Sequence, residues 1–138
     1  MSQPRTAFIA LGSNLGDRAA HLARAIACLG EIPGVAVERA TEAEETAPLG
    51  GLDQPPYLNA MVRVRTTLSP EMLLAACHQI ERDAGRVRTG KWDSRTIDLD
   101  LVMMEGVRSD RPELTLPHPG LPQRDFWARE LAELAADV

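Results

Sequence analysis

Two aspartates separated by a single leucine stand in the apolar segment 96–104, TIDLDLVMM. Alternate side chains of a β-strand share a face, so Asp98 and Asp100 would lie about 6.5 Å apart along the chain on the same side. Mg²⁺ prefers oxygen ligands and often shares one or two carboxylates with substrate phosphates. An exposed strand edge carrying two acids is the ordinary alternative. The apolar neighbours instead favour a buried strand, in which two carboxylates need a partner.

A basic stretch precedes this strand. Positions 86–95 read RVRTGKWDSR and contain four basic residues against one acid, Asp93: Arg86, Arg88, Lys91 and Arg95. Guanidinium groups bind phosphate oxygens in pairs and stabilise the charge that develops during phosphoryl transfer. A solvated basic loop is the alternative interpretation. The position of the stretch beside the aspartate pair favours a site that brings metal ions and phosphate oxygens together.

Two common nucleotide-binding motifs are excluded. The chain has no GxxxxGK[ST] phosphate loop. Residues 12–17, GSNLGD, follow an apolar run as a Rossmann turn would, but they lack GxGxxG, and 138 residues are too few for two Rossmann halves. We therefore interpret residues 12–17 as a tight junction between a strand and a helix.

The bulk composition indicates one globular domain spanning residues 1–138, because a second core would be too small. A net charge of −5 argues against a general affinity for nucleic acid or acidic membranes. No segment has the length or apolarity of a signal peptide or membrane span, so we expect a cytoplasmic protein. Cys28 and Cys77 form no CxxC pair and are expected to be buried, reduced residues.

The hydrophobic periodicity places these residues on alternating strands and helices. Strands are predicted over 6–11, 35–46, 57–67 and 96–104, and helices over 17–30, 70–85 and from residue 125 onward. In the strand 57–67, one face is apolar, whereas Asn59, Arg63 and Arg65 lie on the other, which is typical of a half-buried strand. Residues 106–123 are rich in proline. This order predicts an α+β fold with a mainly antiparallel sheet and helices packed on one face.

Five sequence blocks occur together in this order: ALGSNLGD at 10–17, APLGGLDQPPYLNAMV at 47–62, IERDAGRVR at 80–88, RTIDLDLV at 95–102 and LTLPHP at 114–119. Together they resemble the 6-hydroxymethyl-7,8-dihydropterin pyrophosphokinase family over most of the chain. The resemblance implies a ferredoxin-like α+β fold and a role in folate biosynthesis. It also implies that the pterin hydroxyl attacks the β-phosphorus of ATP and that AMP leaves.

For the ATP side, the resemblance implies that Asp98 and Asp100 hold two Mg²⁺ ions that bridge the phosphates. Arg86 and Arg95 are the basic positions expected to act in the transition state. The residues expected to bind ATP are Glu81, Arg88, Lys91, Arg95, Thr115, His118 and Arg124. A monomer is expected, with ATP and the pterin as its small-molecule partners.

For the pterin side, the resemblance implies a second set of residues: Thr46, Ala47, Leu49, Tyr57, Asn59, Trp92 and Phe126. The residue types suit this role, because aromatic faces hold a flat heteroaromatic ring and an asparagine amide offers both a donor and an acceptor to its polar edge. Trp92 and Phe126 would supply the aromatic faces.

Some positions depart from the family pattern: Ala47, His78, Asp93, Glu113 and Pro119. The residues after Phe126, WARELAELAADV, also differ from the usual apolar sequence. Two other functions therefore stay open at this point. One is a related protein that binds nucleotide or pterin without turnover, and the other is a metal-dependent phosphohydrolase in which water replaces the pterin hydroxyl.

Overall fold

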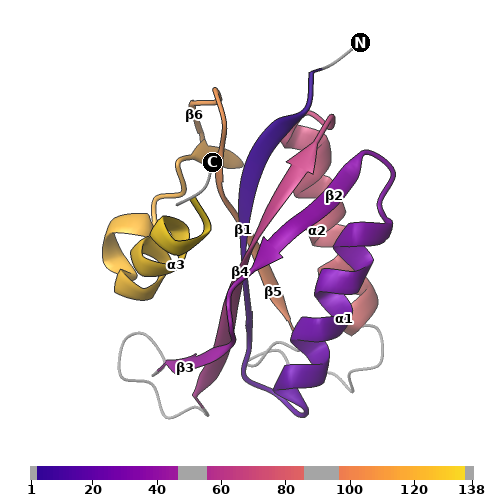
Figure 1. Cartoon of the computed structure of the whole chain (residues 1–138), viewed down its shortest axis with the longest axis vertical. Coiled ribbons are helices and arrows are strands. Elements are labelled where there is room, and N and C mark those ends of the chain that lie inside the picture. The colour runs from indigo at the N-terminus through magenta and orange to yellow at the C-terminus, as the bar shows by residue number, and fades with distance from the viewer. Residues whose placement is uncertain (1–2, 47–55, 86–96, 136–138) are drawn as a thin grey trace.

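The computed structural model describes residues 3–46, 56–85 and 97–135. In these residues a five-stranded antiparallel sheet carries helices on both faces (Figure 1). The elements in chain order are β1 (Arg5–Ser13), α1 (Arg18–Glu31), β2 (Val35–Ala40), β3 (Glu44–Thr46), β4 (Tyr57–Thr66), α2 (Pro70–Gly85), β5 (Asp98–Met104), β6 (Ser109–Arg111), β7 (Leu114–Leu116), the 3₁₀ turn η2 (Leu121–Gln123) and α3 (Asp125–Ala135). None of the helices in these parts of the chain combines the length and apolar composition that a membrane span requires.

The strands follow the order β2-β4-β1-β5, and β3 also pairs with β4. Each long helix connects two strands that have one other strand between them in the sheet: α1 connects β1 to β2, and α2 connects β4 to β5. This is the split βαβ arrangement of ferredoxin-like folds. The predicted α+β class and the antiparallel sheet are confirmed.

Local signals in the sequence position the two long helices. The Asp17 side chain accepts a hydrogen bond from the Ala20 amide at 3.1 Å, and Gly16 has a positive φ of 69°, so residues 12–17 do form a tight junction. The Ser69 hydroxyl likewise accepts from the Met72 amide at 3.1 Å, with Pro70 as the first residue of α2. Both helices bury one apolar stripe against the same face of the sheet (Figure 1).

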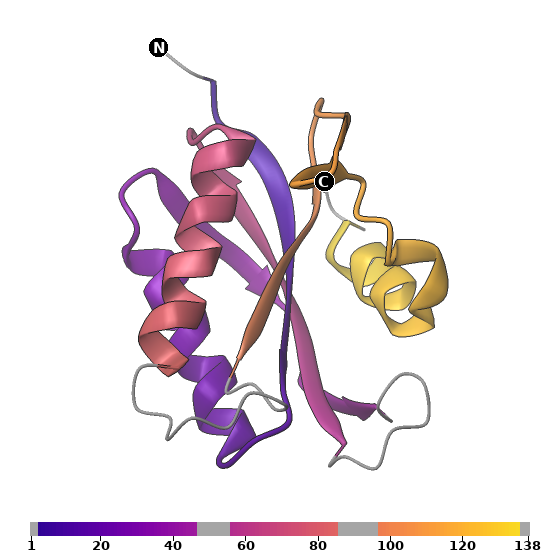
Figure 2. The same ribbon diagram turned by 180° about the vertical axis from the view of Figure 1, so that it is seen from behind.

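The opposite face of the sheet is covered by α3, as the front and back views show (Figure 1 and Figure 2). Its contact with the sheet is a second, smaller apolar cluster: Phe8, Ala10, Met61, Val102, Trp127 and Leu134. The expectation that helices share one face thus holds for α1 and α2, whereas α3 lies on the other side because its own apolar stripe needs a surface to cover. This packing corrects the interpretation of β4 as half-buried, because both faces of the strand hold buried residues. Asn59 and Arg63, which were expected on a solvent-facing side, are buried, and Arg63 Nη1 donates to the Leu134 carbonyl at 2.7 Å.

The segment 35–46 is not one strand, as the sequence pattern predicted, but two. β2 and β3 pair in turn with the same edge of β4, and residues 41–43 separate them. At the break the Thr41 hydroxyl accepts a hydrogen bond from the Met61 amide at 2.9 Å, and the Thr41 amide donates to the Met61 carbonyl at 2.9 Å. A side-chain oxygen therefore satisfies a β4 amide at the interruption, which an alternation pattern does not reveal.

Two irregular features lie beside the edge strand β5. Its pairing with β1 shifts register between Phe8 and Ile9, which makes Val102 an extra residue in the ladder. The Val102 carbonyl accepts a hydrogen bond from the His118 amide at 2.8 Å. The proline-rich stretch also contains a small antiparallel hairpin, β6–β7, that packs against β5 and α2 and was not predicted as an element.

Candidate active site

The site begins where three strands bring small and polar residues into one row. In the pairing register, Gly12 of β1 lies opposite Asp98 of β5 on one side and opposite Asn59 of β4 on the other. Asp100 lies one alternate position further along β5, opposite Ala10. Asp98 and Asp100 alternate with Leu99 and Leu101, which are buried beneath α1 and α2. The two carboxylates therefore share the face that α3 partly covers, as the strand geometry predicted.

Gly12 has a role here that the sequence interpretation did not assign. A Cβ atom at this position would lie 3.1 Å from Asn59 Oδ1 and 3.4 Å from Tyr57 Cδ1. The glycine thus lets the Asn59 and Tyr57 side chains lie across β1 in close contact with its backbone. A glycine within a strand is the sequence signal of such a close approach.

Polar contacts among the predicted pterin-binding residues hold β3 against β4. Thr46 and Tyr57 are partners in the register, and Asn59 Nδ2 donates to Thr46 Oγ1 at 2.5 Å. Asn59 is 7% exposed, so this hydrogen bond fixes its amide in a nearly dry position. The structure therefore brings Thr46, Tyr57 and Asn59 together at one end of the sheet.

Arg18, at the first turn of α1, was missed by the sequence interpretation. Its guanidinium donates from Nη1 to the Pro56 carbonyl at 2.9 Å and from Nη2 to Glu45 Oε2 at 2.6 Å. One side chain thus joins α1 to the residues on either side of the segment 47–55. A lone arginine at the start of a helix gives no sequence signal for this role.

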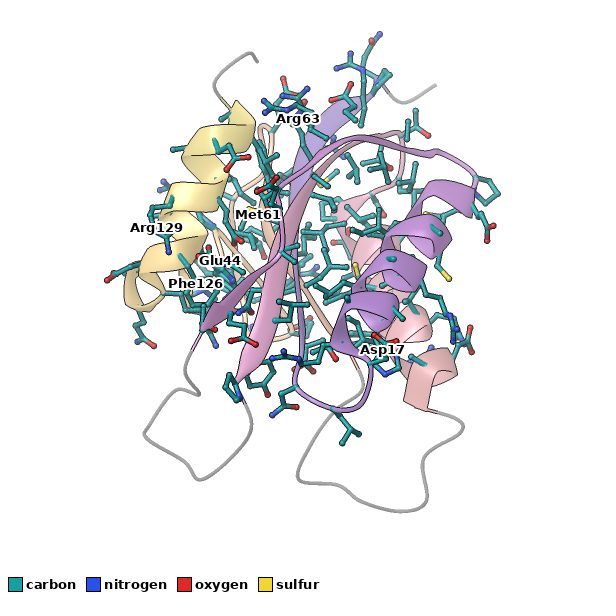
Figure 3. The ribbon with its side chains drawn as sticks, turned by 60° about the horizontal axis from the view of Figure 1, so that its bottom comes forward. Asp17, Glu44, Met61, Arg63, Phe126 and Arg129 are labelled. Atoms are coloured by element: carbon teal, nitrogen blue, oxygen red, sulfur yellow. The ribbon has the colours of Figure 1, made fainter. Side chains whose placement is uncertain are left out.

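Phe126 lies at the first turn of α3, half-buried at the edge of the second apolar cluster. An ion pair between Arg129 Nη1 and Glu44 Oε1, 3.4 Å apart, joins α3 to β3. Figure 3 shows Glu44, Phe126 and Arg129 close together where α3 meets the end of β3. This places the predicted aromatic residue of α3 on the same side of the sheet as Asn59.

A cleft of about 200 Å³ lies on the outer side of β5, between α2 and the β6–β7 hairpin. It is lined by Leu74, His78, Leu99, Asp100, Leu101, Pro112, Glu113, Leu114, Thr115, His118 and Pro119. Two predicted ATP-binding residues, Thr115 and His118, therefore share a cavity with one of the predicted metal ligands. Three of the positions that depart from the family pattern, His78, Glu113 and Pro119, also line it.

His118 is held in a defined orientation. Its Nδ1 accepts a hydrogen bond from the Gly120 amide at 2.9 Å, and its Nε2 lies 3.6 Å from Asp100 Oδ1. An Nδ1 that accepts leaves the proton of the neutral ring on Nε2. The imidazole therefore directs an N–H toward Asp100 and the cleft.

Glu81 is hydrogen-bonded to the backbone of β5 next to the aspartate pair. Its Oε2 accepts a hydrogen bond at 2.8 Å from the amide of Leu99, the residue between Asp98 and Asp100. This bond satisfies a backbone donor on the outer edge of β5 and fixes the strand there. Cys77 is fully buried nearby, and burial, followed by the negative charges of Glu81 and Asp100, raises its pKa to about 12. Its thiol is therefore protonated near neutral pH.

The aspartate pair fits a magnesium ion that is shared with a phosphate chain. No three His, Cys, Asp or Glu side chains converge on a common point within the described residues. Asp98 and Asp100 nevertheless offer two oxygen donors on one face, and both side chains are partly exposed. Mg²⁺ commonly takes only one or two carboxylates when phosphate oxygens and water complete its octahedron.

Arg124 and a neighbouring tryptophan complete the described part of the site. The Arg124 guanidinium lies 4.6 Å from the centroid of the Trp127 ring. Trp127 was not singled out from the sequence. The remaining predicted residues lie outside the described parts of the chain: Ala47, Leu49, Arg86, Arg88, Lys91, Trp92 and Arg95.

Comparison with known proteins agrees with this geometry. The family model of 7,8-dihydro-6-hydroxymethylpterin-pyrophosphokinase matches residues 8–136. The chain is 42% identical over 132 residues to the 2-amino-4-hydroxy-6-hydroxymethyldihydropteridine pyrophosphokinase of Methylorubrum extorquens, covering 96% of this chain and 84% of that protein. It is 39% identical over 132 residues to the protein of the same name from Bacillus subtilis, covering 96% and 79%. The Haemophilus influenzae protein of that name is 36% identical over 133 residues, covering 96% and 83%. The chain belongs to the 7,8-dihydro-6-hydroxymethylpterin-pyrophosphokinase family.

Proposed function

We propose that this chain transfers pyrophosphate from ATP to 6-hydroxymethyl-7,8-dihydropterin, a step of folate biosynthesis that releases AMP. Family membership supports this reaction. The observation that carries it is the position of the aspartate pair: Asp100 lines the cleft beside β5, while Asp98 lies in one row with Gly12 and Asn59. Two carboxylates thus stand between a cavity suited to a nucleotide and a polar row suited to a pterin edge.

For the nucleotide we assign the cleft beside β5. Thr115 and His118 would contact ATP directly, and Arg124 would neutralise part of its phosphate charge. Glu81 also belongs to the proposed nucleotide site, although its hydrogen bond to Leu99 already gives it a structural task. Arg86, Arg88, Lys91 and Arg95 are assigned to the phosphates on the strength of the sequence resemblance.

For the pterin we assign the polar row at the end of the sheet. The Asn59 amide, already oriented by Thr46, would pair with the polar edge of the ring. Tyr57 and Phe126 flank this row, and Ala47, Leu49 and Trp92 are assigned to the same site by resemblance. An amide that is fixed before binding loses little freedom when the substrate arrives.

We assign Asp98 and Asp100 as the protein ligands of two Mg²⁺ ions. When bound there, such ions would supply positive charge that polarises the phosphate oxygens. In the transfer, the pterin hydroxyl oxygen bonds to the β-phosphorus, and the bond from the β-phosphorus to the bridging oxygen of the α-phosphate breaks. The hydroxyl proton passes to solvent, and Arg86 and Arg95 stabilise the charge that develops on the phosphates.

The chain is further proposed to act as a single domain of residues 1–138, as a monomer in the cytoplasm. No interaction with nucleic acid or membranes is needed for this chemistry, and the net charge of −5 does not favour either. Gel filtration combined with light scattering would test the monomer, because a mass of twice 15.1 kDa would contradict it.

The decisive experiment is an AMP-release assay with magnesium-ATP and 6-hydroxymethyl-7,8-dihydropterin. We expect one AMP for each pterin pyrophosphate formed, and no nucleotide loss when the pterin is omitted. Glu31→Ala serves as the control for the Asp98 and Asp100 replacements in this assay, because this exposed acid lies at the end of α1 and is not among the residues that line the cleft. Release of ADP, loss of ATP without pterin, or binding of both substrates without AMP would each contradict the proposal.

A further inference from the structure

Trp127 is in contact with residues assigned to both substrates, although it was assigned to neither. Its side chain is 3% exposed and belongs to the apolar cluster beneath α3. Its ring centroid lies 5.1 Å from that of His118 and 6.5 Å from that of Phe126, both in edge-to-face arrangements. The Arg124 guanidinium carbon lies 4.6 Å from the same ring, over its face. A residue needed only to fill the core would not have to contact three substrate-side groups.

Arg124 is confined from two sides. Its guanidinium lies over the indole face, where the ring quadrupole attracts a cation. On the other side is Gly120, which is buried, and a Cβ atom there would lie only 1.8 Å from Arg124 Nη1. The backbone is fixed too, because the Trp127 amide donates to the Arg124 carbonyl at 2.9 Å. The long side chain therefore occupies a slot formed by the Trp127 ring and by the absence of a side chain at Gly120.

His118 is confined in a related way. Its amide donates to the Val102 carbonyl at 2.8 Å, and its Nδ1 accepts from Gly120 at 2.9 Å. These bonds fix the residue, and the ring planes of His118 and Trp127 meet at 85°. The edge-to-face contact limits rotation of the imidazole, which keeps its Nε2 directed toward Asp100.

We propose that Trp127 is a positioning residue for the nucleotide: its buried ring holds Arg124 and His118 in the orientation that ATP binding requires. The inference rests on the proposed function, which assigns both residues to ATP. Arginine has many rotamers, and ordering it at the moment of binding reduces affinity. A ring that orders it beforehand removes this cost, so loss of the ring should weaken ATP binding without removing any group that touches ATP.

The test measures the dissociation constant for the magnesium complex of a nonhydrolysable ATP analogue by titration calorimetry. We expect Trp127→Leu to bind about fivefold more weakly, the size of a single cation–π contact that is partly exposed to solvent. Leu134→Ala is the matched control, because Leu134 is fully buried in the same cluster and has no assigned substrate contact. It should lower the unfolding midpoint but leave the dissociation constant unchanged.

A double-mutant cycle separates positioning from general loss of packing. If Trp127 acts in part through Arg124, then Trp127→Leu combined with Arg124→Gln should lose less affinity than the sum of the two single losses, and the loss that remains on top of Arg124→Gln is the share that acts through His118. Leu134→Ala combined with Arg124→Gln should show the effect of Arg124→Gln alone. If Trp127→Leu does not fold, Trp127→Phe keeps a ring with a weaker face and should show a smaller loss, about twofold, in the same cycle.

The outcomes distinguish the two proposals. A wild-type protein that neither binds the analogue nor releases AMP would contradict the proposed function, and with it this inference. A wild-type protein that does both, together with unchanged affinity in the Trp127 variants, would contradict the positioning role alone. Additive losses in the cycle would also contradict it, because they would mean that Trp127 does not act through Arg124.

Discussion

Replacement of Glu130 should change how the free energy of unfolding of this protein depends on pH. Glu130 is 3% exposed in α3, and neither of its carboxylate oxygens has a hydrogen-bond partner among the described residues. Its pKa is raised from 4.5 to about 7. Burial is the largest cause, and the charges of Glu44 and Glu133 add to it, whereas Arg129 and the nearby Thr41 hydroxyl act in the opposite direction. The folded protein therefore holds a proton on Glu130 at pH values where the unfolded chain does not.

The direction of the pH dependence follows from this difference. Below the ordinary pKa of 4.5 both states are protonated, so the buried acid imposes no electrostatic cost. As the pH rises toward 7 the unfolded chain ionises first, and the free energy of unfolding falls progressively. Above a pH of about 7 the full cost is present, and the difference between the two pKa values corresponds to about 3 kcal/mol.

Glu130→Gln keeps the size of the neutral acid but cannot ionise. We expect the variant to be more stable than the wild type by about 3 kcal/mol at pH 8 and by less than about 1 kcal/mol at pH 5. Urea denaturation monitored by circular dichroism at both pH values measures the two differences. Glu31→Gln is the control, because Glu31 is exposed at the end of α1 and is not among the charges that shift the pKa of Glu130, so it should give the same small difference at both pH values. If the Glu130→Gln and wild-type stability curves run parallel from pH 5 to 8, the carboxylate is not held in a neutral form and the reasoning is refuted.

Other replacements test the site residue by residue. Asp98→Ala or Asp100→Ala should lower kcat at least about a hundredfold, because a ligand for charge stabilisation is lost, while the circular dichroism spectrum and unfolding midpoint change little. Asn59→Ala should raise the KM for the pterin about tenfold and leave the KM for ATP unchanged in steady-state assays, because the pterin edge loses its oriented amide. Arg18→Ala removes a partly exposed link, so it should cost less than about 1 kcal/mol in urea denaturation yet raise the KM for the pterin, because the residues on either side of 47–55 lose their common anchor.

Each of these expectations has a result that contradicts it. Near-native kcat in both aspartate variants would refute the metal assignment. A change in the KM for ATP equal to that for the pterin would show that Asn59 acts on the whole fold. An unchanged KM for the pterin in the Arg18 variant would show that its bonds to Pro56 and Glu45 do not matter for substrate binding.

The elements that follow local rules were predictable from the sequence. Asp17 and Ser69 stand at the predicted starts of α1 and α2 and accept the capping hydrogen bonds there, because a capping bond spans only three residues. Asp98 and Asp100 share a face because a strand with period two allows nothing else. The split βαβ order followed from the succession of elements, and the family followed from five sequence blocks in one order.

The features that escaped prediction all depend on contacts between distant residues. Arg63 alternates with apolar residues as on a solvent-facing strand, yet α3, more than 60 positions later, covers it. The break between β2 and β3 depends on the Thr41 hydroxyl meeting the Met61 amide. Glu130 gives no sequence signal of burial, since glutamate is ordinarily a surface residue. The contact of Trp127 with His118 likewise depends on the proline-rich stretch packing against β5, where the His118 amide donates to the Val102 carbonyl.

The location of the aspartate pair on the outermost strand of the sheet has a consequence for how molecules of this protein avoid one another. An edge strand presents unpaired amides and carbonyls to which a strand of another molecule can add, and this is a common route to aggregation. In β5 the Leu99 amide is occupied by Glu81, the Val102 carbonyl is occupied by His118, and β7 packs alongside. The residues beside the proposed reaction centre thus also cover this strand edge against self-association, so selection for solubility and selection for catalysis would act on the same few positions.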